Sequence, residues 1–406
     1  MSLKKSSMSQ SESESENESE NEEIDWGEFI INNRYIVLNK IGKGSYCTVW
    51  ATYDINLKKI FALKIYNEED TDDAQNEIQV LNKIKCFNLS NVILYNEYFK
   101  YEYGDDEYVM QIIDLCGYSL NYIIKLFRNK YEFNTTEFDR DKYVNFIYES
   151  YLKLNNLLNN LHKNGYCHTD IKPENILIDI PVLENNIYLN KITTIHNDLI
   201  SCNKKKKITN LIKTLQIECK KIINSFKITE SDIIDYLKEF NFSIKLSDFG
   251  TALIIGDETI YKKHTQYYKS PKILLKYPLD YTYDYWSLAC TLYELLTMEI
   301  LFDPYESDLE DKYGENDDRN LMYLITSTLG IPDKNILLNS KESDIYFDTE
   351  YQVSRGYIDI KHNNFIEKLL TKMGMINNEL TKNKYYELIN FIVTYLSYEY
   401  LYKSVN

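Results

Sequence analysis

Between residues 34 and 115, short hydrophobic runs alternate with turn residues, and this pattern predicts strands. The runs are rich in β-branched and aromatic residues and read RYIVLNKIGKGSYCTVWATYD, KKIFALKIYN and EYVMQIIDLCG. In the segment DAQNEIQVLNKI, which precedes the last run, the apolar positions have helical spacing: Ala74, Ile78, Leu81 and Ile84. This part of the chain is therefore predicted to form a small sheet with one helix.

From Ser119 onward the hydrophobic period changes to that of helices. The clearest case is YVNFIYESYLKLNNLLNNLH, a long apolar-periodic segment. Residues 181–243 interrupt this order, but they contain ITNLIKTLQIECKKIINSF, which has one apolar stripe, and TESDIIDYLKEF, which has a capping pattern at Thr229 and Asp232. This insert is therefore predicted to carry helices of its own.

Residues 1–33 are predicted to be a disordered acidic tail. They include SSMSQSESESENESENEEID, which has almost nothing to bury and whose like charges repel one another. The length of 406 residues and a hydrophobic content of 44% are enough for a folded region of two lobes after this tail. The frequent Tyr, Asn, Ile and Lys are typical of an AT-rich genome, such as that of a protist or a large DNA virus.

Charge and cysteine usage narrow the possible partners and compartment. The formal net charge of −16 argues against nucleic acid, because phosphates need a basic groove, and it suits a basic partner. The seven cysteines are scattered without a C-x-x-C pair, which indicates reduced thiols inside a cell and neither a disulfide framework nor a zinc site. No signal peptide and no apolar run long enough to span a membrane is found. We expect a monomer in the cytoplasm or nucleus, with no membrane partner.

The segment YCHTDIKPENILI, from Tyr166 to Ile178, carries the most specific chemistry. It matches the H-R-D-x-K-x-x-x-N pattern of phosphoryl-transfer enzymes, except that Thr169 replaces the arginine. Phosphoryl transfer requires that phosphates are held, metal ions are placed and an acceptor hydroxyl is oriented. Further elements in the expected order are IGKGSYCTVW at residues 41–50, FALKIY around Lys64, and SDFG around Asp248. In the first of these, Cys47 stands where G-x-G-x-x-G has its third glycine.

Over about residues 34–403 the chain resembles the eukaryotic protein kinases. HTDIKPENIL, the missing third glycine followed by TVW, the long insert before DFG, and the opening IDWGEFIINNRYIVLNKIG are all similar to the SR-protein kinases of the CMGC group. The resemblance implies an α+β, two-lobed fold with a small β-rich N-lobe (34–115) and a larger, mainly helical C-lobe (116–406). It also implies an ATP- and Mg²⁺-dependent serine/threonine kinase acting on basic, Arg/Ser-rich protein substrates.

The resemblance assigns site residues by their match to the motifs. In the catalytic loop, Asp170 would orient the acceptor hydroxyl or accept its proton, and Lys172 would neutralise the transferring group. Asn175 and Asp248 would bind the metal, since Mg²⁺ prefers such oxygens. The nucleotide would contact Ile41, Gly42, Lys43, Gly44, Val49, Ala62, Lys64, its ion-pair partner Glu77, and the hinge at Asp114 and Cys116, with Ile113 as gatekeeper.

Several supporting roles follow from the same resemblance. Thr265 is expected to bond Asp170 and Lys172, and Asp284 to cap backbone amides of the catalytic loop. Because Thr169 carries no charge to pair with a phosphate, we expect an activation loop that is held by packing and ordinary hydrogen bonds. An acid-rich stretch at residues 303–318 would dock arginines, through the side chains Asp308, Glu310, Asp311, Glu315, Asp317 and Asp318.

One departure from the family concerns a buried ion pair. Where the family has a glutamate, this chain has Lys272, and alignment places Lys403 at the position of its usual arginine partner. Two lysines would repel each other, so the buried pair is expected to be absent and the C-lobe less stable. Two alternatives also stay open: a pseudokinase scaffold without turnover, and a dual-specificity kinase similar to the LAMMER kinases, which share H-T-D and retain DFG.

Overall fold

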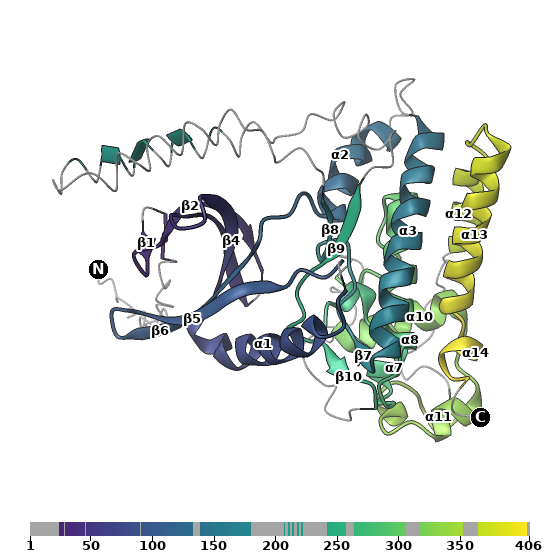
Figure 1. Ribbon diagram of the computed structural model, residues 1–406. Helices are drawn as coiled ribbons and strands as arrows, with labels where there is room; N and C mark the ends of the chain where they lie inside the picture. The colour runs from purple at the N-terminus through teal and green to yellow at the C-terminus, as the bar shows by residue number, and fades with distance from the viewer. Residues whose placement is uncertain are drawn as a thin grey trace, which may run out of the picture.

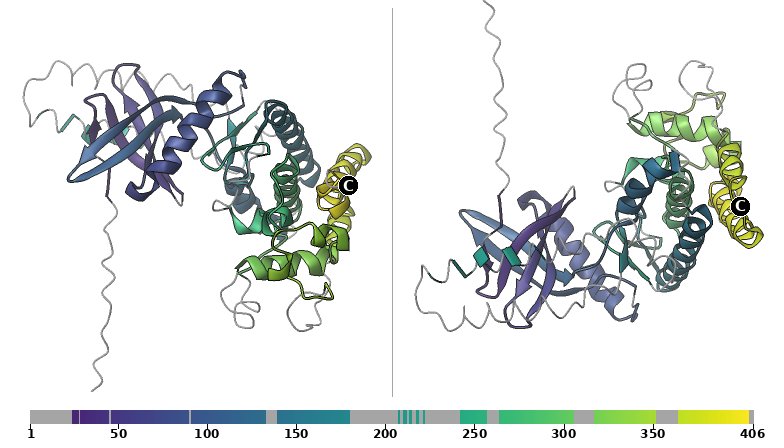
Figure 2. Two further views of the ribbon diagram at one scale, coloured as in Figure 1. Left: turned by 90° about the horizontal axis from the view of Figure 1, so that it is seen from below. Right: turned by 90° about the horizontal axis from the view of Figure 1, so that it is seen from above.

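The computed structural model describes residues 24–27, 29–44, 46–89, 91–132, 139–179, 242–256, 264–305, 317–351 and 364–403, and several positions between 207 and 221. A β-rich lobe precedes a mainly helical lobe in the chain, and the two lie side by side (Figures 1 and 2). This is the protein kinase fold expected from the sequence.

The N-lobe is built on a six-stranded antiparallel sheet with the order β1-β2-β3-β4-β6-β5. Helix α1 (Thr71–Lys85), which follows the short turn η1 (Glu68–Asp70), lies beside this sheet (Figure 2). The strands are β1 (Ile30–Ile31), β2 (Tyr35–Lys43), β3 (Cys47–Asp54), β4 (Lys59–Tyr66), β5 (Tyr95–Tyr103) and β6 (Asp106–Asp114).

Alternation along β4 separates the N-lobe core from the functional face of the sheet. Phe61, Leu63 and Ile65 are buried in one hydrophobic cluster with Trp50. Because successive side chains of a strand point to opposite faces, Ala62, Lys64 and Tyr66 lie on the other face. The sequence KIFALKIY thus supplies both a core stripe and a stripe that faces the site.

The folded N-lobe begins earlier than the boundary at residue 34 that the sequence analysis set. The side chain of Trp26 is only 3% exposed and packs in the same cluster as Ile31 and Tyr35. Its ring also contacts the rings of Tyr101 and Tyr108. The predicted tail of residues 1–33 is therefore wrong at its end: the apolar residues after Asp25 have a large aromatic surface to bury against.

The C-lobe contains several helices around α8 (Thr282–Thr297), in which every residue is buried. Helices α3 and α13 pack against α8 and against each other. The remaining elements are α2 (Leu120–Glu132), α3 (Arg140–Lys163), η3 (Gln266–Tyr268), α7 (Pro271–Leu274), α10 (Asp317–Leu329), α11 (Lys334–Leu338), η4 (Ser343–Ile345), α12 (Phe365–Met373), α13 (Glu379–Tyr395) and α14 (Tyr398–Leu401).

Two short antiparallel pairs connect the C-lobe to the site. β7 (Tyr166–Cys167) pairs with β10 (Leu253–Ile254), and β8 (Ile176–Asp179) pairs with β9 (Ser243–Leu246). The catalytic-loop motif therefore lies between β7 and β8, and the SDFG motif lies between β9 and β10. This pairing brings two motifs that are far apart in sequence to the same place.

The expected repulsion between Lys272 and Lys403 is not observed. Lys403 is exposed, whereas the ammonium of Lys272 is buried and lies 2.6 Å from Asp280 Oδ2. The rings of Tyr283 and Tyr402 face the same ammonium, with centroids at 5.8 and 5.5 Å. A buried ion pair is thus present at this position, with a carboxylate from the start of α8 as the partner.

Much of the predicted insert, residues 181–243, lies outside the described residues. The described positions between 207 and 221 have helical backbone, as the apolar stripe predicted. Within the described part of the chain, no helix combines the length and apolarity needed to cross a membrane.

Candidate active site

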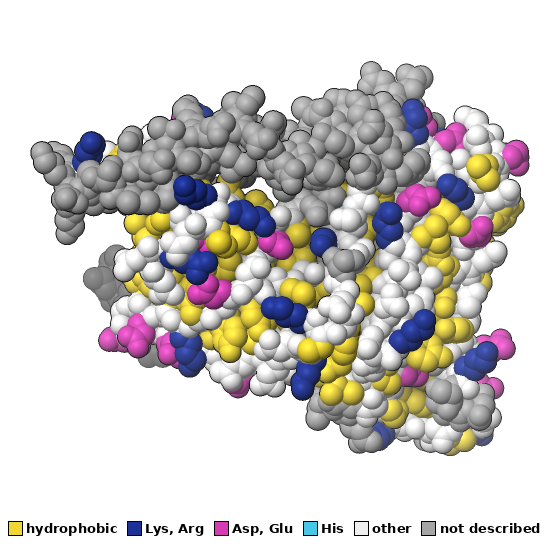
Figure 3. All heavy atoms as spheres, in the orientation of Figure 1, with side chains coloured by type: hydrophobic (Ala, Val, Ile, Leu, Met, Phe, Trp, Pro, Cys, Tyr) yellow, Lys and Arg dark blue, Asp and Glu magenta, His cyan; other side chains and the backbone are white. Residues whose placement is uncertain are grey.

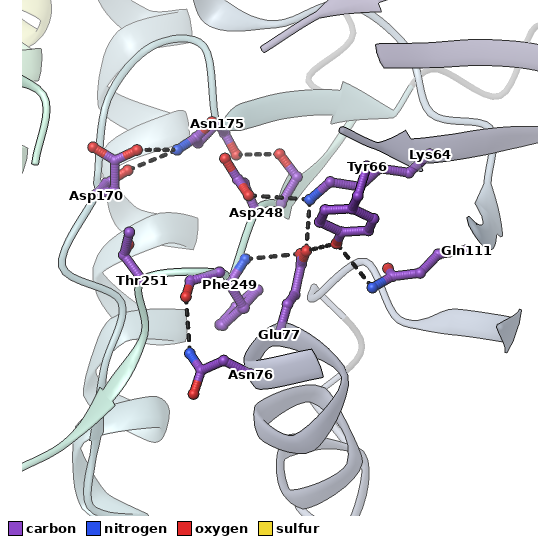
Figure 4. Close-up of polar contacts among 12 residues, drawn as sticks. Lys64, Tyr66, Asn76, Glu77, Gln111, Asp170, Asn175, Asp248, Phe249 and Thr251 are labelled. Atoms are coloured by element: carbon purple, nitrogen blue, oxygen red, sulfur yellow. Dashed lines mark hydrogen bonds and ion pairs between the residues drawn. The ribbon is translucent and has the colours of Figure 1, made fainter. Parts of the chain in front are cut away.

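The site is centred on an ion pair between Lys64 of β4 and Glu77 of α1. The Lys64 ammonium lies 2.6 Å from Glu77 Oε2 and 3.1 Å from Asp248 Oδ1 (Figure 4). Lys64 and Glu77 are only 7% and 3% exposed. The resemblance to the protein kinases implied this ion pair, and the structure contains it.

Helix α1 also holds the SDFG segment directly. The Phe249 amide donates to Glu77 Oε1 at 3.1 Å, and Asn76 Nδ2 donates to the Gly250 carbonyl at 2.9 Å (Figure 4). Because Glu77 accepts from Lys64 with one oxygen and from Phe249 with the other, a single carboxylate joins the two lobes.

The charges of neighbouring side chains favour the ionised forms of Lys64 and Asp248. Burial acts to lower the pKa of Lys64, but Asp248 and Glu77 outweigh it and hold that pKa well above its ordinary value. Burial acts to raise the pKa of Asp248, and the positive charges of Lys64 and Lys172 outweigh it, so that this pKa is lowered. Asp248 is therefore a carboxylate at neutral pH.

The catalytic-loop motif forms a second connected group. Asp170 Oδ2 lies 2.7 Å from the Lys172 ammonium, and Asp170 Oδ1 accepts from the Thr265 hydroxyl at 2.8 Å. Lys172 in turn donates to Thr265 Oγ1 at 2.7 Å. Asn175 Nδ2 donates to the Asp170 carbonyl and to Asp170 Oδ2, at 2.9 and 3.0 Å (Figure 4). A carboxylate held beside a cation in this way can orient a hydroxyl group and accept its proton.

Asp284 of α8 binds backbone amides of the catalytic loop. Its carboxylate accepts from the amides of His168 and Thr169 at 2.9 and 2.7 Å, and it contacts His162 Nε2 at 2.8 Å. Thr169 has a φ of 70°, a conformation that non-glycine residues seldom adopt, and these bonds hold it there. The amide-capping geometry expected for Asp284 is observed.

Thr169 binds the activation loop through its hydroxyl group. Its hydroxyl donates to the Thr251 carbonyl at 2.8 Å, and the Thr251 hydroxyl donates to the His168 carbonyl at 3.4 Å. His264 Nδ1 lies 3.1 Å from the Thr169 carbonyl oxygen. Both described ends of the activation loop are therefore bonded to the catalytic loop, at Thr251 through hydroxyl and carbonyl groups and at His264 and Thr265 through Thr169, Asp170 and Lys172.

The predicted nucleotide-binding positions line neighbouring strands. Val49 is the cross-strand partner of Gly42 and of Lys64, while Ala62 is opposite Ile113. The Gly44 amide donates to the Cys47 carbonyl at 2.8 Å, which closes the turn between β2 and β3. Ile41 and Lys43 lie on the same β2 strand.

The hinge residues lie at the end of β6. The Asp114 carboxylate is 3.1 Å from the Lys59 ammonium, and both side chains are more than half exposed. Cys116 lies close by, with Sγ 3.7 Å from the Asp114 carbonyl oxygen.

The oxygen donors suit a hard divalent cation. Figure 4 shows Asp248 between Lys64 and Asn175, and these residues supply a carboxylate and an amide to this part of the site. Mg²⁺ takes such oxygens and completes its octahedron with waters and phosphate oxygens. The donor set present therefore fits the metal that the resemblance implied.

Two buried polar side chains in this cluster were not among the predicted site residues. Tyr66 donates its hydroxyl to Glu77 Oε2, and Gln111 Nε2 donates to the Tyr66 hydroxyl at 2.8 Å (Figure 4). The available signal was the alternation in FALKIY, which places Tyr66 on the same face of the strand as Lys64.

The acid-rich stretch at residues 303–318 can be assessed only in part, because residues 306–316 lie outside the described part. Asp318 Oδ1 lies 2.6 Å from the Lys269 ammonium and accepts from Gln266 Nε2 at 2.9 Å. Asp317 accepts from the Tyr305 hydroxyl at 2.8 Å. These two acids already have partners within the chain.

Comparison with known proteins agrees with the geometry. The protein kinase domain family matches residues 35–193 and 201–375, and the chain therefore belongs to the protein kinase family. Its relatives include distant kinases of the CMGC type, two of which are named as serine/threonine protein kinases.

Three relatives show the range of similarity. The putative serine/threonine-protein kinase L205 of Acanthamoeba polyphaga mimivirus is 23% identical over 93% of this chain and 86% of its own length. The serine/threonine-protein kinase SRPK of Physarum polycephalum is 25% identical over 91% of this chain and 83% of its own length. A putative dual specificity tyrosine-phosphorylation-regulated kinase 3 homolog of Drosophila melanogaster is 25% identical over 77% of this chain but only 28% of its own length.

Proposed function

We propose that this chain is an active serine/threonine kinase that transfers the γ-phosphoryl group of ATP to hydroxyls of basic, Arg/Ser-rich proteins. The observation that carries the proposal is the connected network from Glu77 through Lys64 and Asp248, together with the Asp170, Lys172 and Thr265 group. A scaffold without turnover would have no need for buried charges arranged in this way, since isolated buried charges are costly.

In the proposed mechanism each charged group has one task. Lys64 would bind the α- and β-phosphates, and Glu77 would fix its direction. Asp248 and Asn175 would hold Mg²⁺, which when bound supplies positive charge next to the phosphates. Asp170 would orient the acceptor hydroxyl and accept its proton, while Lys172 would offset negative charge that develops during transfer.

Two facts support a basic substrate. The net charge of −16 favours association with cations, and one of the more extensively covered relatives is named SRPK. On the face shown in Figure 3, basic and acidic side chains are interspersed over the described surface, so that the acidic excess is not gathered there. Docking would then depend on the acidic segment 1–25 and on Asp308, Glu310, Asp311 and Glu315, because Asp317 and Asp318 already have partners within the chain. Phosphorylation of tyrosine as well is a second candidate, favoured by the name of the Drosophila relative.

The test is phosphorylation in vitro with purified wild type, Lys64→Met, Asp170→Asn and Asp248→Ala. Wild type should transfer phosphate, and each variant should lose about 10²-fold or more while remaining folded by circular dichroism. Equal signal from all four proteins would indicate contamination, and no signal from any of them would indicate a scaffold. A peptide library with Arg-rich, proline-directed and tyrosine-containing sets would then identify the substrate class.

A further inference from the structure

We propose that Tyr66, held by Gln111, is a positioning residue that keeps Glu77 turned toward Lys64, so that the catalytic cleft of this kinase is assembled before any ligand binds. The inference rests on the proposed function, because it assigns to Tyr66 a role in the reaction that Lys64 serves. It concerns two side chains to which the resemblance assigned no role.

The strand register makes this arrangement possible. Tyr66 follows Lys64 by two residues in β4, and Gln111 of β6 is the direct cross-strand partner of Lys64. Side chains that alternate along a strand and pair across it share one face of the sheet. Lys64, Tyr66 and Gln111 therefore meet at the point where α1 presents Glu77.

Tyr66 contacts both members of the ion pair. Its hydroxyl donates to Glu77 Oε2, the same oxygen that accepts from Lys64. Its ring also lies against the Lys64 ammonium, with 4.9 Å between Nζ and the ring centroid. Burial, followed by the charge of Glu77, keeps the pKa of Tyr66 well above its ordinary value, so the hydroxyl stays protonated and remains a donor.

Gln111 fixes the direction of that donation. Because its Nε2 donates to the Tyr66 oxygen at 2.8 Å, the tyrosine proton is left free to point at Glu77. Gln111 is fully buried, and its Oε1 has no hydrogen-bond partner among the described residues. A buried carbonyl without a partner destabilises the fold. Such a cost is expected at a functional site, where Gln111 would be retained for its bond to Tyr66 and not for its contribution to stability.

The packing behind Tyr66 explains how a large ring fits at this position. Cys47, which occupies the place of the third loop glycine, is the cross-strand partner of Tyr66. The two side chains form a small hydrophobic cluster with Ala74 and Ile78 of α1. The ring of Tyr66 therefore packs between Cys47 of β3 and helix α1, and its hydroxyl is the group that forms hydrogen bonds.

The experiment compares Tyr66→Phe and Gln111→Met with Tyr35→Phe. Tyr35 is the matched control, because its hydroxyl donates to Glu97 at 2.7 Å in the same lobe and touches no site residue. Tyr66→Phe should lower kcat about tenfold and weaken MgADP binding, measured by calorimetry, less than about threefold, because the hydroxyl acts on the alignment of Lys64 and not on the nucleotide.

Two further readouts separate positioning from general stability. Gln111→Met should lower kcat without lowering the melting temperature, and it should have no added effect in the Tyr66→Phe background, because Gln111 acts through Tyr66. Hydrogen exchange of the α1 amides, measured without nucleotide, should rise in both variants and not in Tyr35→Phe.

The results that would overturn the inference are distinct from failure of the proposed function. Unchanged α1 exchange in Tyr66→Phe refutes positioning whether or not the enzyme turns over. An active wild type with an inactive Lys64→Met and a Tyr66→Phe variant within about twofold of wild type would refute this inference alone. Equal losses in Tyr66→Phe and Tyr35→Phe would show a loss of lobe stability in place of positioning.

Discussion

Replacing Asp280 by alanine is expected to destabilise the C-lobe far more than replacing Lys272 by methionine, although the two residues form one ion pair. The reason is their unequal burial. The side chain of Lys272 is 2% exposed and that of Asp280 is 19% exposed. Loss of the carboxylate leaves a charge in the interior, whereas loss of the ammonium leaves a charge that water can reach.

The magnitudes follow from the contacts that remain. In Asp280→Ala the ammonium keeps only a 3.4 Å contact with Thr282 Oγ1 and the faces of two tyrosine rings. An unpaired buried charge costs about 3–5 kcal/mol, and the lost acceptor for the Thr282 amide at the start of α8 costs about 1 kcal/mol more. In Lys272→Met the carboxylate keeps the Thr282 amide and hydroxyl, so we expect about 1 kcal/mol or less.

The double variant Lys272→Met/Asp280→Ala should lose only the bond to the Thr282 amide, about 1 kcal/mol, so that the coupling energy of the pair is about 3–6 kcal/mol. Burial already lowers the pKa of Lys272 more than Asp280 raises it, which agrees with a side chain whose charge is held at a cost. The assay is urea unfolding of all four proteins followed by far-UV circular dichroism, which reports mainly the helical lobe.

The matched control is the surface pair Lys368–Glu299, with an N–O distance of 2.8 Å and side chains that are 48% and 51% exposed. Its cycle should give less than about 1 kcal/mol. A coupling energy for Lys272 and Asp280 no larger than that of the control, or equal costs for the two single variants, would refute the reasoning from burial.

Three other outcomes are expected. Burial raises the pKa of Glu294 from 4.5 to about 6, so the folded chain binds this proton more tightly than the unfolded chain, and the contribution of Glu294 to stability falls as the pH rises through that window. Glu294→Gln should therefore raise the free energy of unfolding by about 1–2 kcal/mol at pH 7.5 but by little at pH 4. A pH-independent difference in denaturant titrations would contradict this. Phosphatase treatment should leave activity within about twofold, because Thr169 has no charge to pair with a loop phosphate; loss of activity together with loss of a loop phosphate would refute it. Trp26→Ala should destabilise the N-lobe by about 3–5 kcal/mol, and an unchanged thermal melt would show that the segment before β1 is not part of its core.

The fold could be predicted largely from local pattern. Alternation in KKIFALKIYN and helical spacing in DAQNEIQVLNKI each follow from the geometry of one element, and the sheet and α1 form where these patterns lie. The end of the acidic tail could not be located in the same way. Trp26 is flanked by acidic residues in the sequence EEIDWGE, so no local hydrophobic pattern marks it as buried. Its ring packs against Tyr101 of β5 and Tyr108 of β6, which come about 75 residues or more later in the sequence.

The site could be predicted where a motif fixes the spacing. Asp170, Lys172 and Asn175 lie in one loop, and the structure brings them within hydrogen-bond distance of one another or of Thr265. The partner of Lys272 could not be found by the same means. Family position placed Lys403 opposite Lys272, and the ion pair was expected to be absent, but the partner, Asp280, is only eight residues from Lys272.

The hydroxyl groups of Thr169 and Tyr66 have similar physical roles. At Thr169 the side chain cannot recruit a phosphate, and its hydroxyl instead binds the Thr251 carbonyl inside the protein. At Tyr66 a hydroxyl adds a bond to the Glu77 carboxylate, supported by the neutral amide of Gln111. Such bonds are short-ranged and buried, so salt screens them far less than it screens exposed charges. Assembly of this cleft would then depend on buried ion pairs and hydrogen bonds within the chain, while recognition of a basic substrate would depend on exposed acidic groups that salt does screen.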